Sequence, residues 1–180
     1  TPTNLRHGLY KRPVGSTAHV LGDFGRERPF NAVAFRPPNE RTLIPVVDAR
    51  ASSEHPGGYM AWNALWGGDW ATYGEGAGSW LETRFGSNWL VTEFAYRNRN
   101  GTNEANREIQ LTFDDGSTQT FKLSQHVQND PKPHYFMLDP PVRTSSVRLD
   151  VLTVYGSGNN GAKLLQFFSS PRVSELQLTL

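Results

Sequence analysis

Short runs of alternating apolar residues, separated by turn residues, are the feature that most limits how this chain can fold. In the stretch REIQLTFDDGSTQTFKL, Ile109, Leu111 and Phe113 precede an Asp-Asp-Gly-Ser turn, and Phe121 and Leu123 follow it. Alternation of this kind buries one face of a β-strand. Two such runs joined by a short glycine-containing turn predict a β-hairpin.

The same period of two residues recurs through most of the chain after residue 46. The faces predicted to be buried are Leu81, Thr83 and Phe85; Leu90, Thr92, Phe94 and Tyr96; Val147, Leu149 and Val151; and Leu176, Leu178 and Leu180. No stretch keeps the helical period of about 3.6 residues over three turns. Many short strands with Gly, Pro and Asn turns between them predict an all-β protein built as an antiparallel sandwich.

Residues 1–45 differ from the rest of the chain in composition. They hold six of the twelve prolines, and only residues 18–24 and 30–35 resemble strands. Proline fixes the φ angle and removes a backbone donor, which favours extended segments. We therefore interpret residues 1–45 as an extended arm or linker that packs on a domain formed by residues 46–180.

Charge and cysteine content exclude several classes of protein. The 180 residues include 18 Lys and Arg against 17 Asp and Glu, for a net charge of +1, and the basic residues are scattered, which argues against a nucleic-acid partner. The absence of cysteine excludes a disulfide scaffold, a thiolate zinc site and a cysteine nucleophile. No apolar run approaches the roughly 20 residues of a membrane span. The first residues lack the apolar core of a signal peptide, so either the protein is cytoplasmic or a leader precedes this chain.

Motifs for catalysis and cofactor binding are weak. The stretch GSGNNG at residues 156–161 fits G-x-G-x-x-G, but the residues before Pro171 are too few for the helix of a dinucleotide fold. We interpret it as a flexible loop between strands that could line a binding site. Glu75, Glu82 and Asp69 could supply a carboxylate pair for glycoside hydrolysis, but nothing in the sequence fixes their separation. We expect that the protein is not an enzyme.

The stretch YRNRNGTNEANR, between two predicted strands, is a candidate binding loop. It places Arg97 and Arg99 around Asn98, with further asparagines close behind. Guanidinium and amide groups hold hydroxyls or carboxylates in fixed directions. A solvated hairpin loop without a ligand would have the same composition, so both readings stay open.

The block ARASSEHPGGYMAWNALWGGDWATYGEGAGSWLETRFG resembles the opening of discoidin domains, also called coagulation factor type C domains, and of related galactose-binding-like carbohydrate-binding modules. The landmarks are Ala-Ser-Ser at residues 51–53, Asn-Ala-Leu at 63–65, Gly-Gly-Asp at 67–69, Thr72 and Ser-Trp-Leu at 79–81. The resemblance covers about residues 47 to 180. It implies an antiparallel jelly-roll β-sandwich of the galactose-binding-like kind, here with an extended N-terminal arm.

This resemblance also implies a structural calcium ion in the loop that contains the landmarks. Calcium prefers about six to eight oxygen ligands. Trp66 stands where the family usually has the loop aspartate, and Asp69 is its candidate replacement. The expected ligands are the side chains of Asp69, Thr72 and Glu175, with main-chain oxygens near Asn63 and Trp66.

Members of this group mostly bind ligands through loops at one end of the sandwich. A sugar needs an aromatic plate for its C–H face and a few polar groups for its hydroxyls. The predicted contacts are Tyr59, Trp62 and Trp70 for the plate, and His55, Arg97, Asn98, Arg99 and Asn160 for the hydroxyls. Each aromatic ring could equally pack beneath the sandwich. We expect Trp66 and Trp80 inside, and Trp62 or Trp70 at the rim.

These observations predict a non-catalytic glycan-binding module of a secreted or cell-surface protein, with a role such as cell adhesion. Its partner would be a glycan or glycoconjugate, and residues 1–45 could link it to a protein partner or an adjoining catalytic domain. The alternative is a protein-interaction or assembly domain with the same fold. Membrane attachment is less favoured, because no loop pairs apolar spikes with a basic ring.

Overall fold

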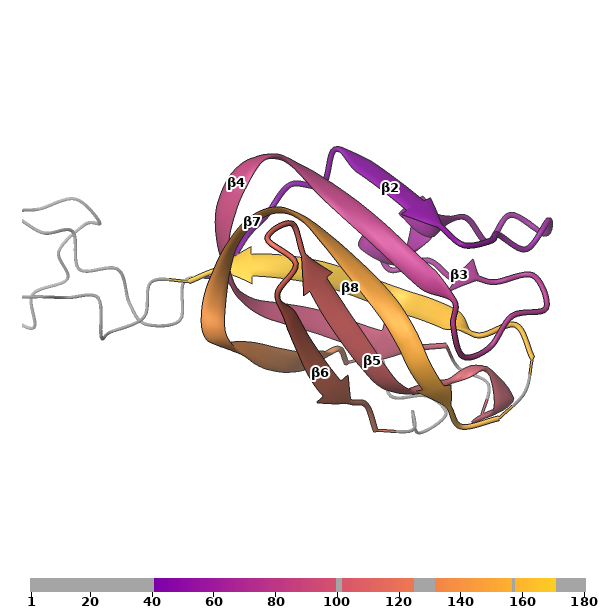
Figure 1. Ribbon diagram of the computed structural model, residues 1–180. Helices are drawn as coiled ribbons and strands as arrows, with labels where there is room; N and C mark the ends of the chain where they lie inside the picture. Colours follow the sequence, from indigo (N-terminus) through magenta and orange to yellow (C-terminus); the bar gives the residue numbers. More distant parts are fainter. Residues whose placement is uncertain (1–40, 100–101, 125–131, 157, 171–180) are drawn as a thin grey trace, which may run out of the picture. The chain divides into compact units, whose positions relative to one another are not determined.

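Two long strands, β4 (Trp80–Asn98) and β7 (His134–Val154), run antiparallel to each other and bend, so that each contributes to both layers of a β-sandwich (Figure 1). The register of this pair shifts between Arg84 and Trp89 of β4. Before the shift β4 pairs with the second half of β7, and after it with the first half of β7 and with β8. Strands that change sheet in this way form the corners of a sandwich.

The other strands complete the two layers around this pair. In one layer β2 (Asp48–Ala51) pairs with β4, and β5 (Asn106–Phe113) pairs with both β7 and β6 (Thr118–Lys122). In the other layer β8 (Gly161–Ser169) pairs with β4, with β1 (Thr42–Leu43) and with β3 (Trp70–Ala71).

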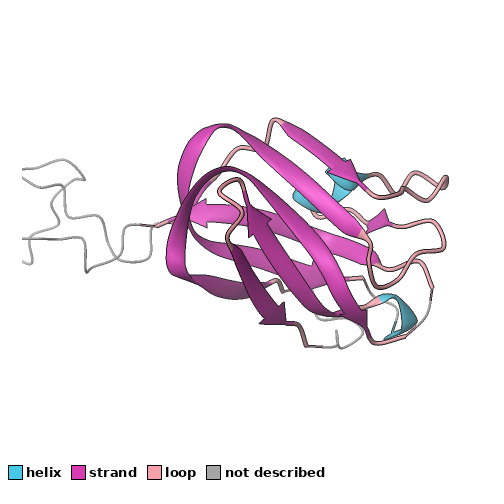
Figure 2. Cartoon of the chain, in the orientation of Figure 1, coloured by secondary structure: helices cyan, strands magenta, loops and turns pink. Residues whose placement is uncertain are grey.

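The computed structural model describes residues 41–99, 102–124, 132–156 and 158–170. The helices in these ranges are two short 3-10 helices, η1 (Ala61–Leu65) and η2 (Thr102–Glu104), and neither is long enough to cross a membrane (Figure 2). The strands predicted at residues 18–24, 30–35 and 176–180 lie outside the described residues, as does Glu175. The predicted all-β antiparallel class is confirmed.

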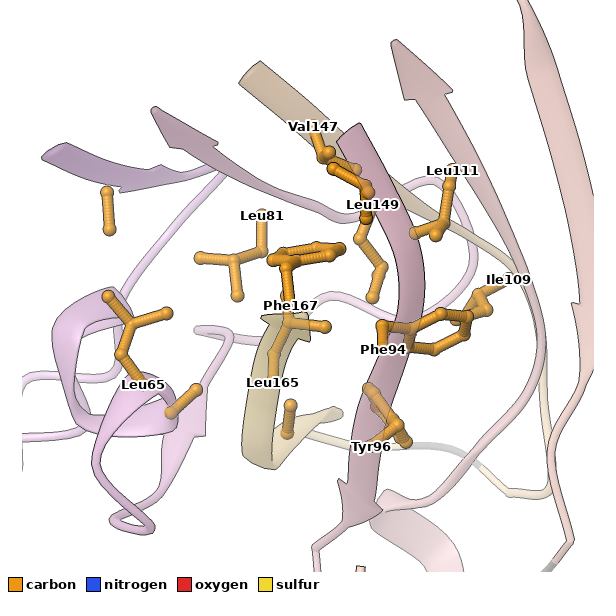
Figure 3. Packing of buried hydrophobic residues seen from close by; sticks show 14 of the residues in the cluster. Leu65, Leu81, Phe94, Tyr96, Ile109, Leu111, Val147, Leu149, Leu165 and Phe167 are labelled. Atoms are coloured by element: carbon orange, nitrogen blue, oxygen red, sulfur yellow. The ribbon is translucent and has the colours of Figure 1, made fainter. Parts of the chain in front are cut away.

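The faces predicted from alternation line the core between the two layers. Figure 3 shows Leu81 and Phe94 of β4, Ile109 of β5 and Leu149 of β7 converging there, joined by Phe167 of β8, which was not among the predicted faces. All five side chains are 0% exposed. Since deleting a large buried side chain costs about 2–5 kcal/mol, these alternating positions account for much of the stability of the sandwich.

Two central parts of the sandwich lack a simple alternation. In the second half of β4 both faces are buried, so Glu93 and Ala95 are 3% and 0% exposed beside the inward-facing Phe94. Glu93 is paired there with Arg41. In β8 the apolar pairs Leu164–Leu165 and Phe167–Phe168 stand on either side of Gln166, so apolar and polar residues do not alternate. Without a period of two this strand was not predicted.

The paired structure begins within the range that we predicted as an arm. Thr42 and Leu43 pair with Ser169 and Phe168 of β8, and Ile44 is 2% exposed in the core. An apolar side chain at position 44 therefore belongs to the sandwich. Residues 1–40 of the predicted arm lie outside the described residues.

The predicted hairpin of β5 and β6 is confirmed, and its turn is bonded to β7. Gly116 in the turn has φ +81°, which favours glycine. The Asp114 carboxylate accepts hydrogen bonds from the backbone N–H and the hydroxyl of Ser145, both at 2.7 Å. These bonds lower the pKa of Asp114 from its ordinary value.

The pKa of Asp114 is lower in the folded state than in the unfolded state, so the ionised carboxylate stabilises the fold. This stabilisation is complete above the ordinary aspartate pKa and is lost as the pH falls through the lowered pKa of the folded state. We expect Asp114→Asn to lower the melting temperature by about 1–3 °C at pH 7. That difference should shrink as the pH falls below about 4. Thermal melts of both proteins from pH 7 to strongly acidic pH test this, and a difference that stays constant with pH would contradict it.

Candidate functional site

The loops that follow β2, β3, β4 and β7 meet at the end of the sandwich opposite the bends of β4 and β7, and we call this the loop end (Figure 1). Ser53 Oγ in the first of these loops accepts a hydrogen bond from Tyr73 N in the second at 3.0 Å. Asn159 in the last loop accepts from Gly74 N at its side-chain oxygen (2.8 Å) and from Arg99 Nη1 at its main-chain oxygen (2.6 Å). These bonds hold all four loops together.

A buried network of amide and hydroxyl groups lies beneath the loop end. Asn160 Nδ2 donates to Ser79 Oγ and to Asn106 Oδ1, both at 2.8 Å. Asn160 Oδ1 accepts from Thr72 Oγ1 at 2.7 Å. Because buried polar groups are costly unless hydrogen-bonded, this network fixes the positions at which the loops leave their strands.

Tyr96 and Asn98 extend the network into β4. Tyr96 Oη accepts from Asn106 Nδ2 at 2.8 Å and lies 3.0 Å from Gly161 O, to which it donates. Burial raises the pKa of the Tyr96 hydroxyl far above its usual value, so the group stays a neutral donor. Asn98 exchanges hydrogen bonds with the backbone of Asn106. The predicted sugar contacts Asn98 and Asn160 are 3% and 1% exposed, and their polar atoms are used inside the protein.

A charged cluster lies above the network, centred on Arg99. Arg99 Nη1 is 3.2 Å from Glu104 Oε1, and its Nε is 3.7 Å from Asp69 Oδ2. Lys163 Nζ is 3.6 Å from the other carboxylate oxygen of Asp69. The Arg99 guanidinium also lies over the Tyr59 ring, 5.2 Å from its centroid. The charges of the two cations and the two carboxylates cancel. Arg99, which was predicted to contact a sugar, is already paired with protein groups.

Three aromatic side chains, His55, Tyr59 and Tyr73, form an aromatic group at the loop end. The His55 ring meets those of Tyr59 and Tyr73 edge-to-face, with centroids 5.5 and 5.7 Å apart. Tyr73 is 66% exposed. The structure thus brings together the predicted residues His55 and Tyr59 and adds Tyr73. Sequence reasoning did not single out Tyr73, although its place next to the Thr72 landmark could have indicated it.

The tryptophans are placed differently from the prediction. Trp70 is 0% exposed, and its indole N–H donates to Ser53 O at 3.1 Å, because β3 packs into the core against β8. Trp66 is 76% exposed, because it lies at the end of η1 where Gly67, with φ +86°, turns the chain. The prediction of Trp66 inside is therefore wrong, and of the two tryptophans offered for the rim, Trp70 is buried. Trp62, at 36% exposed, does lie at the rim.

Arg97, another predicted contact, lies away from the aromatic group. It lines a cavity of about 10 Å³ together with Ser124 and His134, where the ends of β4 and β6 lie near the start of β7. Such a volume has room for about one water molecule and none for a sugar ring. A second small cavity lies beside Trp66 and is lined mostly by apolar residues such as Leu43 and Leu165.

The described residues of the predicted calcium set face different protein groups. The Asp69 carboxylate faces Arg99 and Lys163, and Thr72 donates its hydroxyl proton within the buried network. No cluster of three or more His, Asp or Glu side chains able to hold a metal occurs in the part of the chain that the structure describes. The set also includes Glu175, which lies outside the described residues, and main-chain oxygens, so the calcium site stays a prediction.

Solved structures with the same fold were found at low sequence identity. The family 32 carbohydrate-binding module of NanJ from Clostridium perfringens, in complex with galactose, matches with a TM-score of 0.58 and 19% identity, over 72% of this chain and 100% of that chain. An F5/8 type C domain from Bacteroides fragilis matches with a TM-score of 0.59 and 14% identity, over 75% and 100% of the two chains. Truncated AlyQ, with CBM32 and alginate lyase domains, matches with a TM-score of 0.59 and 14% identity, over 74% of this chain and 34% of that chain.

These likenesses define the class of the domain as a discoidin-like β-sandwich, the fold shared by family 32 carbohydrate-binding modules and F5/8 type C domains. The predicted resemblance is thereby confirmed. No curated protein matches the chain by sequence. A family profile matches residues 46–164, and the chain belongs to that family, which is described as a domain of unknown function, DUF7402.

Proposed function

We propose that this domain is a non-catalytic glycan-binding module, and that its contact surface is the aromatic group His55, Tyr59 and Tyr73 at the loop end. The observation that carries the proposal is the exposure of Tyr73, at 66%, with its ring supported by His55. Exposed aromatic rings held in place by neighbours are the surfaces on which the C–H faces of sugars pack. The described fold and its neighbours support binding more than catalysis.

A partly exposed carboxylate suited to sugar hydroxyls, Glu104, lies beyond the aromatic group and is paired with the largely buried Arg99. A continuous series of contacts leads from Tyr73 through His55 and Tyr59 to Arg99 and Glu104. The pairing of Arg99 with carboxylates fixes the guanidinium without adding net charge, which favours an uncharged sugar over an acidic one. Binding surfaces of this kind combine a few directional polar groups with an apolar plate.

The structural neighbours support the same proposal in a general way. The NanJ module was solved in complex with galactose, and AlyQ carries its module in one chain with an alginate lyase domain. We infer a comparable setting here, in which the domain works outside the cell or at its surface and brings an adjoining domain or protein partner to a polysaccharide.

Binding of the full chain to a glycan array, followed by calorimetry on any sugar that binds, tests this proposal. We expect Tyr73→Ala to weaken binding at least about tenfold, which corresponds to an aromatic contact of about 1.4 kcal/mol. The melting temperature should not change, because Tyr73 is exposed. Tyr135→Ala is the matched control, since Tyr135 is 47% exposed but lies on β7 away from the aromatic group. An array without any bound sugar, or equal losses in the two variants, would refute the proposal.

A protein-interaction domain is the second candidate, and the surface around Trp66 favours it. Trp66 and Leu43, which line the second small cavity, are 76% and 46% exposed. Exposed apolar residues that gather around a cavity are typical of interaction sites. If no glycan binds, Trp66→Ser should reduce binding to a purified partner, whereas Tyr73→Ala should not.

A further inference from the structure

The charged cluster around Asp69 points to a way of holding the loop between η1 and β3 without a metal ion. We propose that Lys163 and Arg99 supply, as side-chain cations, the positive charge that the resemblance assigns to calcium in this loop. The proposal concerns the stability of the loop end, and it holds whether or not the domain binds a glycan.

Both oxygens of the Asp69 carboxylate face a cation. Oδ1 is 3.6 Å from Lys163 Nζ, and Oδ2 is 3.7 Å from Arg99 Nε. The three side chains are only 23%, 24% and 9% exposed, so solvent and salt screen their interaction weakly. A divalent cation bound to Asp69 would lie close to two positive charges, which opposes its binding.

The other predicted ligands are already used as donors or acceptors. Asn63 O accepts from Gly68 N at 2.8 Å and from Trp66 N at 3.1 Å, which closes the turn after η1. The Asn63 side chain donates its amide N–H groups to Gly58 O at 2.7 Å and to Asp69 O at 3.1 Å. These bonds shape the loop by themselves, and none of them needs a metal ion.

Thr72 is also committed to the protein. It is 0% exposed, and its hydroxyl proton is donated to Asn160 Oδ1 at 2.7 Å. The hydroxyl is thus enclosed in the buried network, away from solvent.

The positions of the two cations explain how they can replace a bound ion. Lys163 lies on β8 and Arg99 directly follows β4, whereas Asp69 directly precedes β3. The ion pairs therefore tie the loop to two neighbouring strands that are far apart in sequence. A calcium ion would hold the loop in the same manner through shared ligands.

Thermal melts of the full chain, residues 1–180, test the proposal, because this chain includes Glu175. After metal is removed with EGTA, we expect the melting temperature to stay within about 1 °C when calcium chloride is added in excess. A calcium site occupied at about 100 times its Kd would instead raise the melting temperature by roughly 5–10 °C. A saturating rise of that size would overturn the proposal.

Variants test the role of the cations separately from the metal. Lys163→Met keeps the apolar stem and removes the charge, and we expect it to lower the melting temperature by about 2–4 °C with or without calcium. Asp69→Asn removes the pairs with both Lys163 and Arg99 and should cost at least as much. The double variant should lose little more than Asp69→Asn alone, because the Lys163 pair is already gone in that variant. Lys122→Met, on an exposed position of β6, is the control and should change nothing. Additive losses, or no loss in Lys163→Met, would contradict the proposal.

Discussion

Asn160→Ala is expected to lower the free energy of unfolding by about 4 kcal/mol, because it removes three buried hydrogen bonds and leaves Ser79 Oγ and Asn106 Oδ1 without their donor. The side chain is 1% exposed and bonds to Thr72, Ser79 and Asn106. Unsatisfied buried donors and acceptors cost about 1–3 kcal/mol each. Urea denaturation followed by tryptophan fluorescence measures the loss.

Asn159→Ala is the matched control for this prediction. Asn159 is the neighbouring residue, is only half-buried, and uses its side chain for one bond, to Gly74 N. We expect it to cost less than about 1 kcal/mol. If both variants cost the same, the buried network does not hold the loop end. If Asn160→Ala keeps its stability but loses glycan binding, Asn160 contacts the ligand as the sequence predicted.

The fold was predictable because burial on one face leaves a period of two in the sequence. Leu81, Thr83 and Phe85 all face the core, as their alternation indicated. The pattern fails where a strand has neighbours on both sides and is covered on both faces. At Glu93 a charged residue is buried because Arg41 pairs with it, and no local pattern contains that pairing.

The placement of the tryptophans could not be read from their spacing. Trp62, Trp66 and Trp70 are each four residues apart, but a 3-10 helix, a glycine turn and a strand lie between the first and the last. Which ring is buried depends on the strand that each one meets. Trp70 meets β8, whereas Trp66 follows the end of η1 and stays exposed.

The charged cluster depends even more on the fold. Asp69, Arg99 and Lys163 come from three segments that are distant in sequence and meet only after β3, β4 and β8 have packed. The sequence identified Asp69 and Arg99 separately, as a metal ligand and a sugar contact. It offered no sign that they face each other, and Lys163 was not identified at all.

The last glycine of GSGNNG, Gly161, is needed for strand packing and not for binding a dinucleotide. It lies at the start of β8, opposite Ala71 of β3. A Cβ atom at this position would be 2.0 Å from Trp70 O and 2.8 Å from Trp70 C. Both are backbone atoms, so no side-chain rotation can relieve the overlap.

We expect Gly161→Ala to lower the free energy of unfolding by at least about 3 kcal/mol, because β3 must move away from β8 to admit the methyl group. That movement would also disturb the Gly161 carbonyl, which accepts hydrogen bonds from Tyr96 and Asn106. Gly76→Ala is the control, since the nearest atom to its added Cβ is Val154 Cγ2 at 3.9 Å, and it should stay within about 0.5 kcal/mol of the unmodified protein. Urea denaturation of both variants gives the comparison. Equal stabilities of the two variants would mean that Trp70 of β3 does not lie this close to Gly161 of β8. The close approach of these two strands would then not be what stabilises the buried network.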